Sequence, residues 1–227
     1  MCLILAAWRT VPGYPLVVAA NRDEFHGRPA SLAQFWKDDP DILAGRDLQA
    51  MGTWMGVTRG GRFAAVTNYR GAREPSAPHS RGALVTGFLK SNASTAAAYI
   101  RDVQTGAKQY SGFNLLATDG QEFWWISNRD SGPRQLQPGI YGLGNLLLDS
   151  PEVEAAKQRF REAIAPAPAV EVLFGVLTEA RIVDSQYGTR CSTVTMFNGH
   201  RVRFAERSFT PDGEAGETLH FEFSVKA

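Results

Sequence analysis

The sequence predicts an antiparallel α+β protein. Pairs of apolar runs separated by short turns rich in Gly, Asn or Asp recur along the chain, and such pairs indicate β-hairpins. Helical periodicity is confined to a few stretches in the middle and second half. The chain has 227 residues, of which 44% are hydrophobic, which is enough to bury a large core. Because no linker stands out, we expect one domain spanning residues 1–227.

The chain opens with a hairpin followed by a loop. Apolar runs at 3–8 and 16–20 flank a Val-Pro-Gly-Tyr-Pro turn, which is the usual signal for two paired strands. Residues 25–41 are mostly polar, and we expect a long loop there. A short strand should follow at 42–45.

The middle of the chain predicts two further hairpins with helices between them. The first pairs 53–58 with 62–67 around a Gly-Gly turn. Residues 71–82, rich in Gly, Pro and Ser, form either a lid or a plain surface loop. Helices are expected at 83–90 and 94–104, and the next hairpin pairs 113–117 with 122–127 around Asp119-Gly120.

The second half predicts two helices and then the strongest hairpin. The helices should cover 150–164 and 170–179. An Asn198-Gly199 turn joins apolar runs on either side, which predicts a hairpin over 192–207. Residues 218–225 alternate between apolar and polar side chains, so they should form a half-buried strand.

The first hairpin sets a cysteine against a run of polar residues. If its turn centres on Pro12 and Gly13, Cys2 lies opposite Asp23. A one-residue shift of the turn moves the facing residue within the window 21–25. The thiol should therefore lie against the segment Asn21-Arg22-Asp23-Glu24.

That placement suggests acyl-transfer chemistry. If Met1 is removed, Cys2 carries both a thiol and a free α-amine, with ordinary pKa values of about 8.5 and about 7.7–8.0. The amine can then act as the general base for its own nucleophile. Arg22 should lower the thiol pKa, and Asp23 should hold the terminal ammonium group. The alternative is that Cys2 is simply a small buried hydrophobe at the start of a core strand.

Several motifs resemble those of the NRDE family, the transport and Golgi organisation protein 2 type. The resemblance covers nearly all of the chain. It is carried by Asn21-Arg22-Asp23-Glu24, Arg28-Pro29, Gly52-Thr53-Trp54-Met55-Gly56, Val66-Thr67-Asn68-Tyr69, Gly112-Phe113-Asn114-Leu115, Tyr141-Gly142-Leu143-Gly144-Asn145 and Tyr187-Gly188-Thr189-Arg190.

The family in turn resembles cysteine N-terminal-nucleophile (Ntn) hydrolases of the penicillin V acylase and bile salt hydrolase branch. This second resemblance rests mainly on Cys2, on Asn21 and Asp23, and on Asn145. It implies an αββα sandwich of two antiparallel sheets between helical layers. The acylase branch usually carries an arginine immediately before its Asn-x-Asp, whereas this chain has Ala20 there.

Further site candidates are two asparagines, a tyrosine and an arginine. Acyl transfer needs donors aimed at the developing oxyanion. Asn145, after a Gly-rich segment, resembles the oxyanion asparagine of the acylase branch, and Asn68 could add a second donor. Either could instead be a turn asparagine that bonds its own backbone. Tyr69 and Arg190, together with Asn21, Arg22 and Glu24, are expected to bind ligand; Arg190 could alternatively form a surface ion pair.

Composition excludes several classes of partner. A net charge of +1 gives no general attraction to nucleic acid or anionic membranes. The longest apolar runs are too short for a transmembrane helix, and no basic segment precedes the first run. Two cysteines make no disulfide framework, so we expect a cytoplasmic protein. The four histidines are scattered, so no metal site and no required cofactor are predicted; haem remains possible as a ligand.

Two functional classes remain open. One is an enzyme in which Cys2 hydrolyses an amide or thioester of a hydrophobic metabolite, with Asp23 and Arg22 orienting the terminus. The other is a non-catalytic protein that binds and traffics a hydrophobic or amphipathic molecule, for which the NRDE resemblance implies haem or acyl-CoA. Either way, we expect Cys2, Asp23, Asn68, Asn145 and Arg190 to line one cleft.

Overall fold

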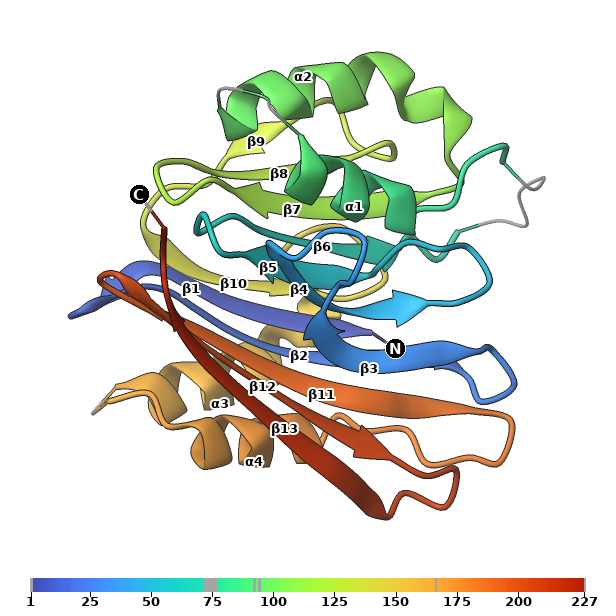
Figure 1. Ribbon diagram of the computed structural model, residues 1–227, viewed down its shortest axis with the longest axis vertical. Helices are drawn as coiled ribbons and strands as arrows, with labels where there is room; N and C mark the ends of the chain where they lie inside the picture. The colour runs from blue at the N-terminus through green and yellow to red at the C-terminus, as the bar shows by residue number, and fades with distance from the viewer. Residues whose placement is uncertain (1, 72–76, 92, 94, 166, 227) are drawn as a thin grey trace. The chain divides into compact units, whose positions relative to one another are not determined.

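The computed structural model describes residues 2–71, 77–91, 93, 95–165 and 167–226 (Figure 1). The chain divides into two compact units, each assembled from segments that are distant in sequence. The first comprises Met1–Arg28, Pro138–Gly144 and Leu148–Val225, and the second comprises Pro29–Gln137, Asn145–Leu147 and Lys226–Ala227. That the whole of 1–227 acts as one domain stays a prediction.

The first unit contains a six-stranded sheet in which every neighbouring pair is antiparallel. The strand order is β10–β1–β2–β11–β12–β13. The strands are β1 (Leu3–Val11), β2 (Tyr14–Phe25), β10 (Gly139–Leu143), β11 (Tyr187–Asn198), β12 (Arg201–Phe209) and β13 (Ala215–Ser224). The predicted hairpin around Asn198-Gly199 is confirmed, and β13 shows the expected alternation of half-buried and exposed residues.

The first hairpin is confirmed, but its register differs by one residue from the prediction. Val11 pairs with Tyr14, as a Pro-Gly turn requires, and the register then shifts between Trp8 and Val11. Arg9 lies within this bulge at a φ of 52°, in the left-handed region. Beyond the bulge Leu3 pairs with Asn21, so the same register places Arg22, not Asp23, opposite Cys2.

Two helices cover one face of this sheet, as predicted. They are α3 (Glu154–Ile164), which follows a short 3-10 turn η2 (Pro151–Val153), and α4 (Val170–Thr178). Their apolar faces pack on alternate residues of the central strands, because side chains along a strand point to one face every second residue. The buried cluster includes Leu3, Leu5, Ala7, Val17, Ala19, Phe160, Leu173, Leu177, Val194 and Met196.

The second unit contains a seven-stranded antiparallel sheet in the order β3–β4–β5–β6–β7–β8–β9. Its strands are β3 (Ala30–Phe35), β4 (Ile42–Asp47), β5 (Met55–Thr58), β6 (Phe63–Asn68), β7 (Phe113–Thr118), β8 (Phe123–Ser127) and β9 (Arg134–Gln135). The hairpins predicted around Gly60-Gly61 and Asp119-Gly120 are both confirmed by their pairing.

Helices α1 (Gly82–Lys90) and α2 (Ala96–Gly106) pack on one face of this second sheet, and a 3-10 turn η1 (Ala107–Gln109) follows α2. The Thr95 side chain caps α2 by accepting a hydrogen bond from the Ala98 amide. The expected start of this helix at Ser94 and part of the predicted 71–82 loop lie outside the described residues.

The expectation of a continuous polar loop over 25–41 is wrong. Residue 25 still belongs to β2, and β3 occupies Ala30–Phe35 at the edge of the second sheet. Only Ala33 of this strand is buried, and the pairing with β4 is interrupted by a bulge between Ser31 and Gln34. An edge strand needs little apolar burial, so its sequence lacks the usual hydrophobic signal.

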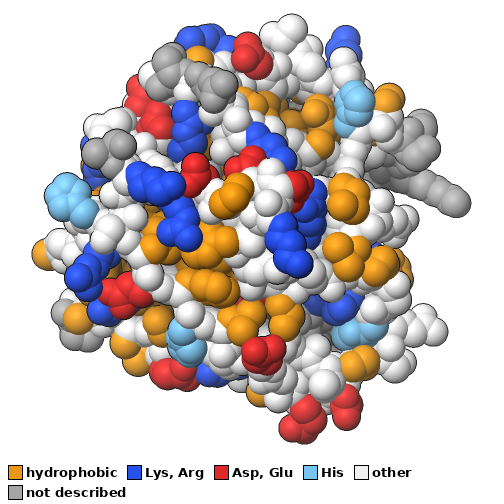
Figure 2. All heavy atoms as spheres, viewed as in Figure 1, with side chains coloured by type: hydrophobic (Ala, Val, Ile, Leu, Met, Phe, Trp, Pro, Cys, Tyr) orange, Lys and Arg blue, Asp and Glu red, His pale blue; other side chains and the backbone are white. Residues whose placement is uncertain are grey.

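The described residues include no helix long and apolar enough to cross a membrane. On the face shown in Figure 2, Lys and Arg side chains are interspersed with Asp and Glu, and hydrophobic side chains lie between them.

Candidate functional site

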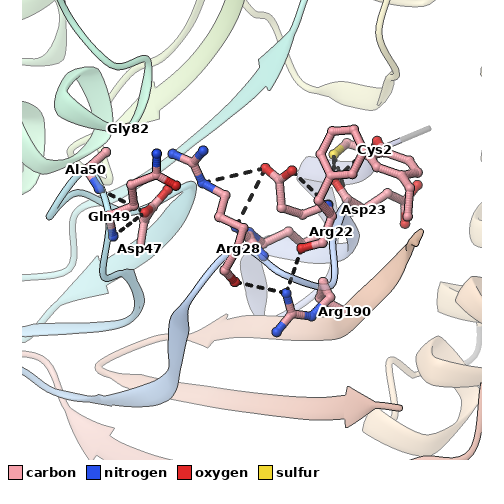
Figure 3. A network of polar contacts seen from close by, with 12 residues as sticks. Cys2, Arg22, Asp23, Arg28, Asp47, Gln49, Ala50, Gly82 and Arg190 are labelled. Atoms are coloured by element: carbon pink, nitrogen blue, oxygen red, sulfur yellow. Dashed lines mark hydrogen bonds and ion pairs between the residues drawn. The ribbon is translucent and has the colours of Figure 1, made fainter. Parts of the chain in front are cut away.

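Cys2 lies immediately before β1 and is bonded to the backbone of β2. Its Sγ is 3.4 Å from the Asp23 amide nitrogen, which donates to it, and 3.4 Å from the Asp23 carbonyl oxygen, which accepts from it (Figure 3). The residue is partly exposed. The predicted proximity of Cys2 to Asp23 is therefore confirmed, because the shifted register stays within the predicted window.

The Asp23 carboxylate is held in one orientation. Asp23 is only 4% exposed, and its Oδ1 accepts a 2.6 Å hydrogen bond from the Thr189 hydroxyl. Thr189 pairs with Asp23 across β2 and β11, and its hydroxyl also accepts from the Ile182 amide at 2.9 Å. A threonine that both donates and accepts in this way fixes the carboxylate beside the start of the chain.

The environment of the thiol raises its pKa. Burial is the main cause and the negative charge of Asp23 adds to it, so the pKa of Cys2 rises from its ordinary value to about 11. The Asp23 amide and the Arg22 guanidinium act in the opposite direction but are outweighed. Arg22 thus acts on the Cys2 pKa in the expected direction, but burial and the Asp23 charge outweigh it in the chain that carries Met1.

Arg22 lies beside a second cysteine. It pairs with Cys191 across β2 and β11, and its side chain is only 11% exposed. Both cysteines are free thiols. Burial, followed by the nearby Glu206 carboxylate, raises the pKa of Cys191 well above its ordinary value, and Arg22 only partly offsets this.

Asn21 has a structural role. It is completely buried, its Nδ2 donates to the Leu177 carbonyl at 2.9 Å, and its Oδ1 accepts from the Ser192 hydroxyl at 2.6 Å. The Leu177 carbonyl lies in the last turn of α4 and also accepts from the Ala180 amide at 3.1 Å, so Asn21 gives this helix end a second donor. Asn21 was expected to bind ligand, but its buried side chain is not accessible to a ligand.

Arg190 holds a segment of backbone. Its Nη1 donates to the carbonyl oxygens of Phe25, His26 and Arg28 at 3.0, 3.2 and 3.1 Å (Figure 3). Desolvation, followed by the nearby Arg22 charge, lowers the pKa of its guanidinium. Arg190 therefore shapes the segment after β2, and a role in binding ligand stays a prediction.

Glu24 makes looser contacts at the same end of β2. Its Oε2 is 3.9 Å from both Arg22 Nη2 and Arg28 Nε, and its Oε1 accepts from the Phe25 amide at 2.8 Å. Its side chain is 24% exposed, so one carboxylate edge remains reachable from solvent.

The predicted asparagines come together in the second unit. Asn145 is 6% exposed, its Nδ2 donates to the Asn68 carbonyl at 2.8 Å, and its own carbonyl accepts from the Arg70 amide at 2.6 Å. The Tyr69 amide donates to the Gly112 carbonyl, which continues the alignment of β6 with β7. That these residues share a cleft with Cys2, Asp23 and Arg190 of the first unit stays a prediction.

Comparison with known proteins identifies the family. The family model for Transport and Golgi organisation 2 matches residues 1–211. The Transport and Golgi organization 2 homolog of Mus musculus is 34% identical and that of Homo sapiens is 33% identical, each alignment covering all of both chains. The chain belongs to the Transport and Golgi organisation 2 family.

Solved structures similar to this family member are Ntn hydrolases. The C2A mutant of conjugated bile acid hydrolase from Clostridium perfringens superposes with a TM-score of 0.55 at 10% identity, covering 99% of this chain and 98% of the other. A second variant of that hydrolase gives 0.59 at 8% identity, covering 98% and 97%. The predicted α+β fold class, that of the Ntn hydrolases, is confirmed.

Sequence reasoning missed two residues of the site. Thr189 and Tyr187 both lie in the Tyr-Gly-Thr-Arg motif, yet neither was assigned a role. The Tyr187 hydroxyl donates to the Asp23 carbonyl oxygen at 3.3 Å. The motif was the available signal, and only the pairing of β11 with β2 shows what it does.

No predicted site residue of this family member lines the cavity found in the second unit. That cavity has a volume of about 570 Å³ and is lined by residues of 77–78, 104–111 and 126–132. Among the described residues, no three His, Cys, Asp or Glu side chains converge as a metal site would require.

Proposed function

We propose that Cys2 of this family member, once Met1 is removed, is the nucleophile in the hydrolysis of an amide or thioester of a hydrophobic metabolite. One observation carries this proposal. The thiol of the second residue is held within 3.4 Å of two backbone atoms of Asp23, whose buried carboxylate is itself fixed by Thr189. Such preorganisation is what a nucleophile and the group that orients it require.

The chemistry follows from the two groups that Cys2 would then carry. Its α-amine takes the thiol proton as sulfur attacks the carbonyl carbon, which forms a tetrahedral intermediate. The resulting ammonium group returns this proton to the departing amine or thiolate, leaving a thioester on Cys2. Water then attacks that thioester, and the α-amine transfers the proton from water back to the sulfur. The products are a carboxylic acid and a free amine or thiol.

Asp23 would hold the terminal ammonium group, and Arg22 would offset the charge of that carboxylate near the sulfur. Their burial supports this, because charges interact more strongly away from water. Asn145 and Asn68 remain the predicted oxyanion donors. The proposal includes a cytoplasmic location, where free thiols such as Cys2 and Cys191 persist.

The comparisons supply supporting analogy. The conjugated bile acid hydrolase that shares this fold is a hydrolase by name, and its C2A variant replaces a cysteine at position 2. Because the two chains are 10% identical, this analogy reaches the reaction class and not the substrate.

The alternative proposal is a non-catalytic protein that binds and traffics haem or acyl-CoA. The observation that favours it is the Cys2 pKa of about 11, which leaves very little thiolate near neutral pH while Met1 is present. The words transport and Golgi organization in the names of its relatives are consistent with trafficking.

The deciding experiment compares two forms of the protein, one beginning at Cys2 and one retaining Met1, each verified by intact mass. Both forms are incubated with a medium-chain acyl thioester and an N-acyl amide, and hydrolysis and the acyl adduct are measured by mass spectrometry. The proposal predicts hydrolysis and a Cys2 adduct only for the form that begins at Cys2. Absence of both from that form, together with saturable binding of haem or acyl-CoA in titrations, would establish the alternative.

A further inference from the structure

We propose that Phe25 and Tyr187 form the surface that binds the apolar group of the substrate attacked by Cys2. This inference rests on the proposed function and specifies its substrate class: an acyl compound whose carbonyl carries a ring or another compact apolar group. All of the residues concerned belong to the first unit.

The first step is the position of Tyr187 relative to the thiol. The Tyr187 hydroxyl donates to the Asp23 carbonyl oxygen at 3.3 Å, and the Cys2 thiol donates to the same oxygen at 3.4 Å. Two groups that share one acceptor atom lie within a few ångströms of each other. The phenol ring of Tyr187 therefore extends from the immediate surroundings of the sulfur.

The second step is the aromatic pair that continues from this ring. Tyr187 and Phe25 face each other across β11 and β2. Their rings make an edge-to-face contact with centroids 5.2 Å apart and planes at 74°. A continuous aromatic surface thus runs from the hydroxyl near Cys2 out to the Phe25 ring.

The third step is the exposure of that surface. Phe25 is 60% exposed, more than any other large hydrophobic side chain among the described residues. Leaving a phenylalanine ring in water forfeits the free energy that its burial would supply. An exposed ring that continues the aromatic surface of Tyr187 is therefore suited to burial by a ligand.

The fourth step is the rigidity of the presentation. The Phe25 amide donates to Glu24 Oε1 at 2.8 Å, and the Phe25 carbonyl accepts from Arg190 at 3.0 Å. Both backbone polar groups are thus held by neighbouring side chains. A preorganised ring loses little conformational entropy on binding, which favours affinity.

The chemical class follows from the geometry. Neither ring carries a charge, and an edge-to-face pair offers ring faces and edges that favour another ring or a compact alicyclic group. With sulfur at one end of the surface, the apolar group should be attached directly to the carbonyl that sulfur attacks.

The experiment uses two electrophiles that differ only in their apolar group, N-phenylmaleimide and N-ethylmaleimide. The full-length chain beginning at Cys2 is labelled with each, and the rate at Cys2 is followed by peptide mass spectrometry. Each rate is divided by the rate with N-acetylcysteine, which removes intrinsic reactivity. We expect a normalised phenyl-to-ethyl ratio above one for the wild type.

Three variants sharpen the test. Phe25→Ala should lower the normalised ratio about 3- to 10-fold, the range expected for loss of one aromatic contact. Tyr187→Phe keeps the ring and should preserve the ratio. Val172→Ala, which truncates a 51% exposed side chain on α4 of the same unit, is the matched surface control and should leave the ratio unchanged.

Each negative result has a separate meaning. A wild-type ratio of one, or a ratio that Phe25→Ala leaves unchanged, overturns this inference while leaving Cys2 available as a nucleophile. Failure of Cys2 to react with either maleimide in the processed chain overturns the proposed function and this inference with it. Because Phe25 is exposed, Phe25→Ala should fold normally, and an unchanged thermal midpoint would verify this.

Discussion

Cys2 and Cys191 lie on either side of Arg22, and they differ in solvent exposure and in their acidic neighbours. Cys191 is embedded in β11, 8% exposed, with Glu206 and Arg22 nearby. Cys2 is partly exposed and precedes β1, with Asp23 as its neighbour. Burial raises the pKa of both thiols despite Arg22. A nearby cation therefore does not by itself lower the pKa of a desolvated thiol. In the proposed function, removal of Met1 gives a free α-amine to Cys2 and leaves Cys191 unchanged.

The largest difference between the two should appear on substitution. In the processed chain, Cys2→Ala should abolish the acyl adduct, and Cys2→Ser should slow turnover by at least about 100-fold, because an alcohol is a much weaker nucleophile near neutral pH. Cys191→Ala should retain the adduct. The measurement is acyl-adduct formation by intact mass, with ligand affinity measured in parallel.

Ligand affinity is the control in that experiment, since Cys2→Ala removes the reacting atom and little else. Affinity within about twofold of the wild type would show that the variant is folded. An adduct that persists in Cys2→Ala and disappears in Cys191→Ala would reverse the assignment of the two thiols.

The second prediction concerns alkaline pH in the chain that retains Met1. The Cys2 thiol ionises near its ordinary pKa when unfolded and near 11 when folded, so the folded state binds more protons between these values. Stability is therefore complete below about pH 9 and falls above it, by about 1.4 kcal/mol per pH unit for each such thiol. Cys2→Ala should remove this contribution from the pH dependence of urea unfolding.

Cys191 provides the matched comparison because its pKa is also raised. Cys191→Ala should therefore also reduce the loss of stability at alkaline pH. Removal of Met1 should make the pKa values of the two thiols differ. Removing Met1 places an ammonium group on Cys2 itself, which should lower the labelling midpoint of Cys2 and leave that of Cys191 unchanged. A Cys2 midpoint that stays near pH 11 in the processed chain would favour the binding protein over the enzyme.

Features that depend on neighbouring residues could be predicted from sequence. The turn at Pro12 and Gly13 and its two apolar runs specify the first hairpin locally. Its register could not be predicted to the residue, because the bulge depends on Arg9 adopting a positive φ that few residue types signal. The edge strand Ala30–Phe35 was missed because it buries only Ala33.

The contacts of the candidate site also divide into local ones that the sequence predicts and distant ones that it does not. The motifs singled out Cys2 and Asp23, and the hairpin brings them together as predicted. The role of Asn21 could not be predicted, since its partner in α4 is 156 residues away. Thr189 is 166 residues from Asp23, and only the pairing of β11 with β2 makes them neighbours.

The third prediction tests whether the hydrogen bond from Thr189 to the Asp23 carboxylate matters for stability and for the reaction of Cys2. Thr189→Val removes the hydroxyl bonded to the buried Asp23 carboxylate and to the Ile182 amide. Leaving such groups without this partner should cost about 1–3 kcal/mol in the free energy of unfolding. In the processed chain it should also slow acyl-adduct formation, since Asp23 would lose its fixed orientation.

Thr195→Val is the matched control on the same strand. The Thr195 hydroxyl is buried and has no hydrogen-bond partner among the described residues, so replacing it with a methyl group should be neutral or slightly stabilising. Equal losses of stability in the two variants would indicate a general sensitivity of β11, and would remove the special role given to Thr189.

The smallest effect should come from Glu24, the acidic residue at the edge of the Cys2 region. It is 3.9 Å from both Arg22 and Arg28, at the outer limit of an ion pair, and its side chain is 24% exposed. Charge pairs this long whose carboxylate is open to solvent contribute little, so Glu24→Gln should change the free energy of urea unfolding by less than about 0.5 kcal/mol. The amide still accepts from the Phe25 amide, which keeps that segment in place. A loss of more than about 1.5 kcal/mol in the free energy of unfolding would instead mean that the ion pair with Glu24 holds the Arg22 side chain in place.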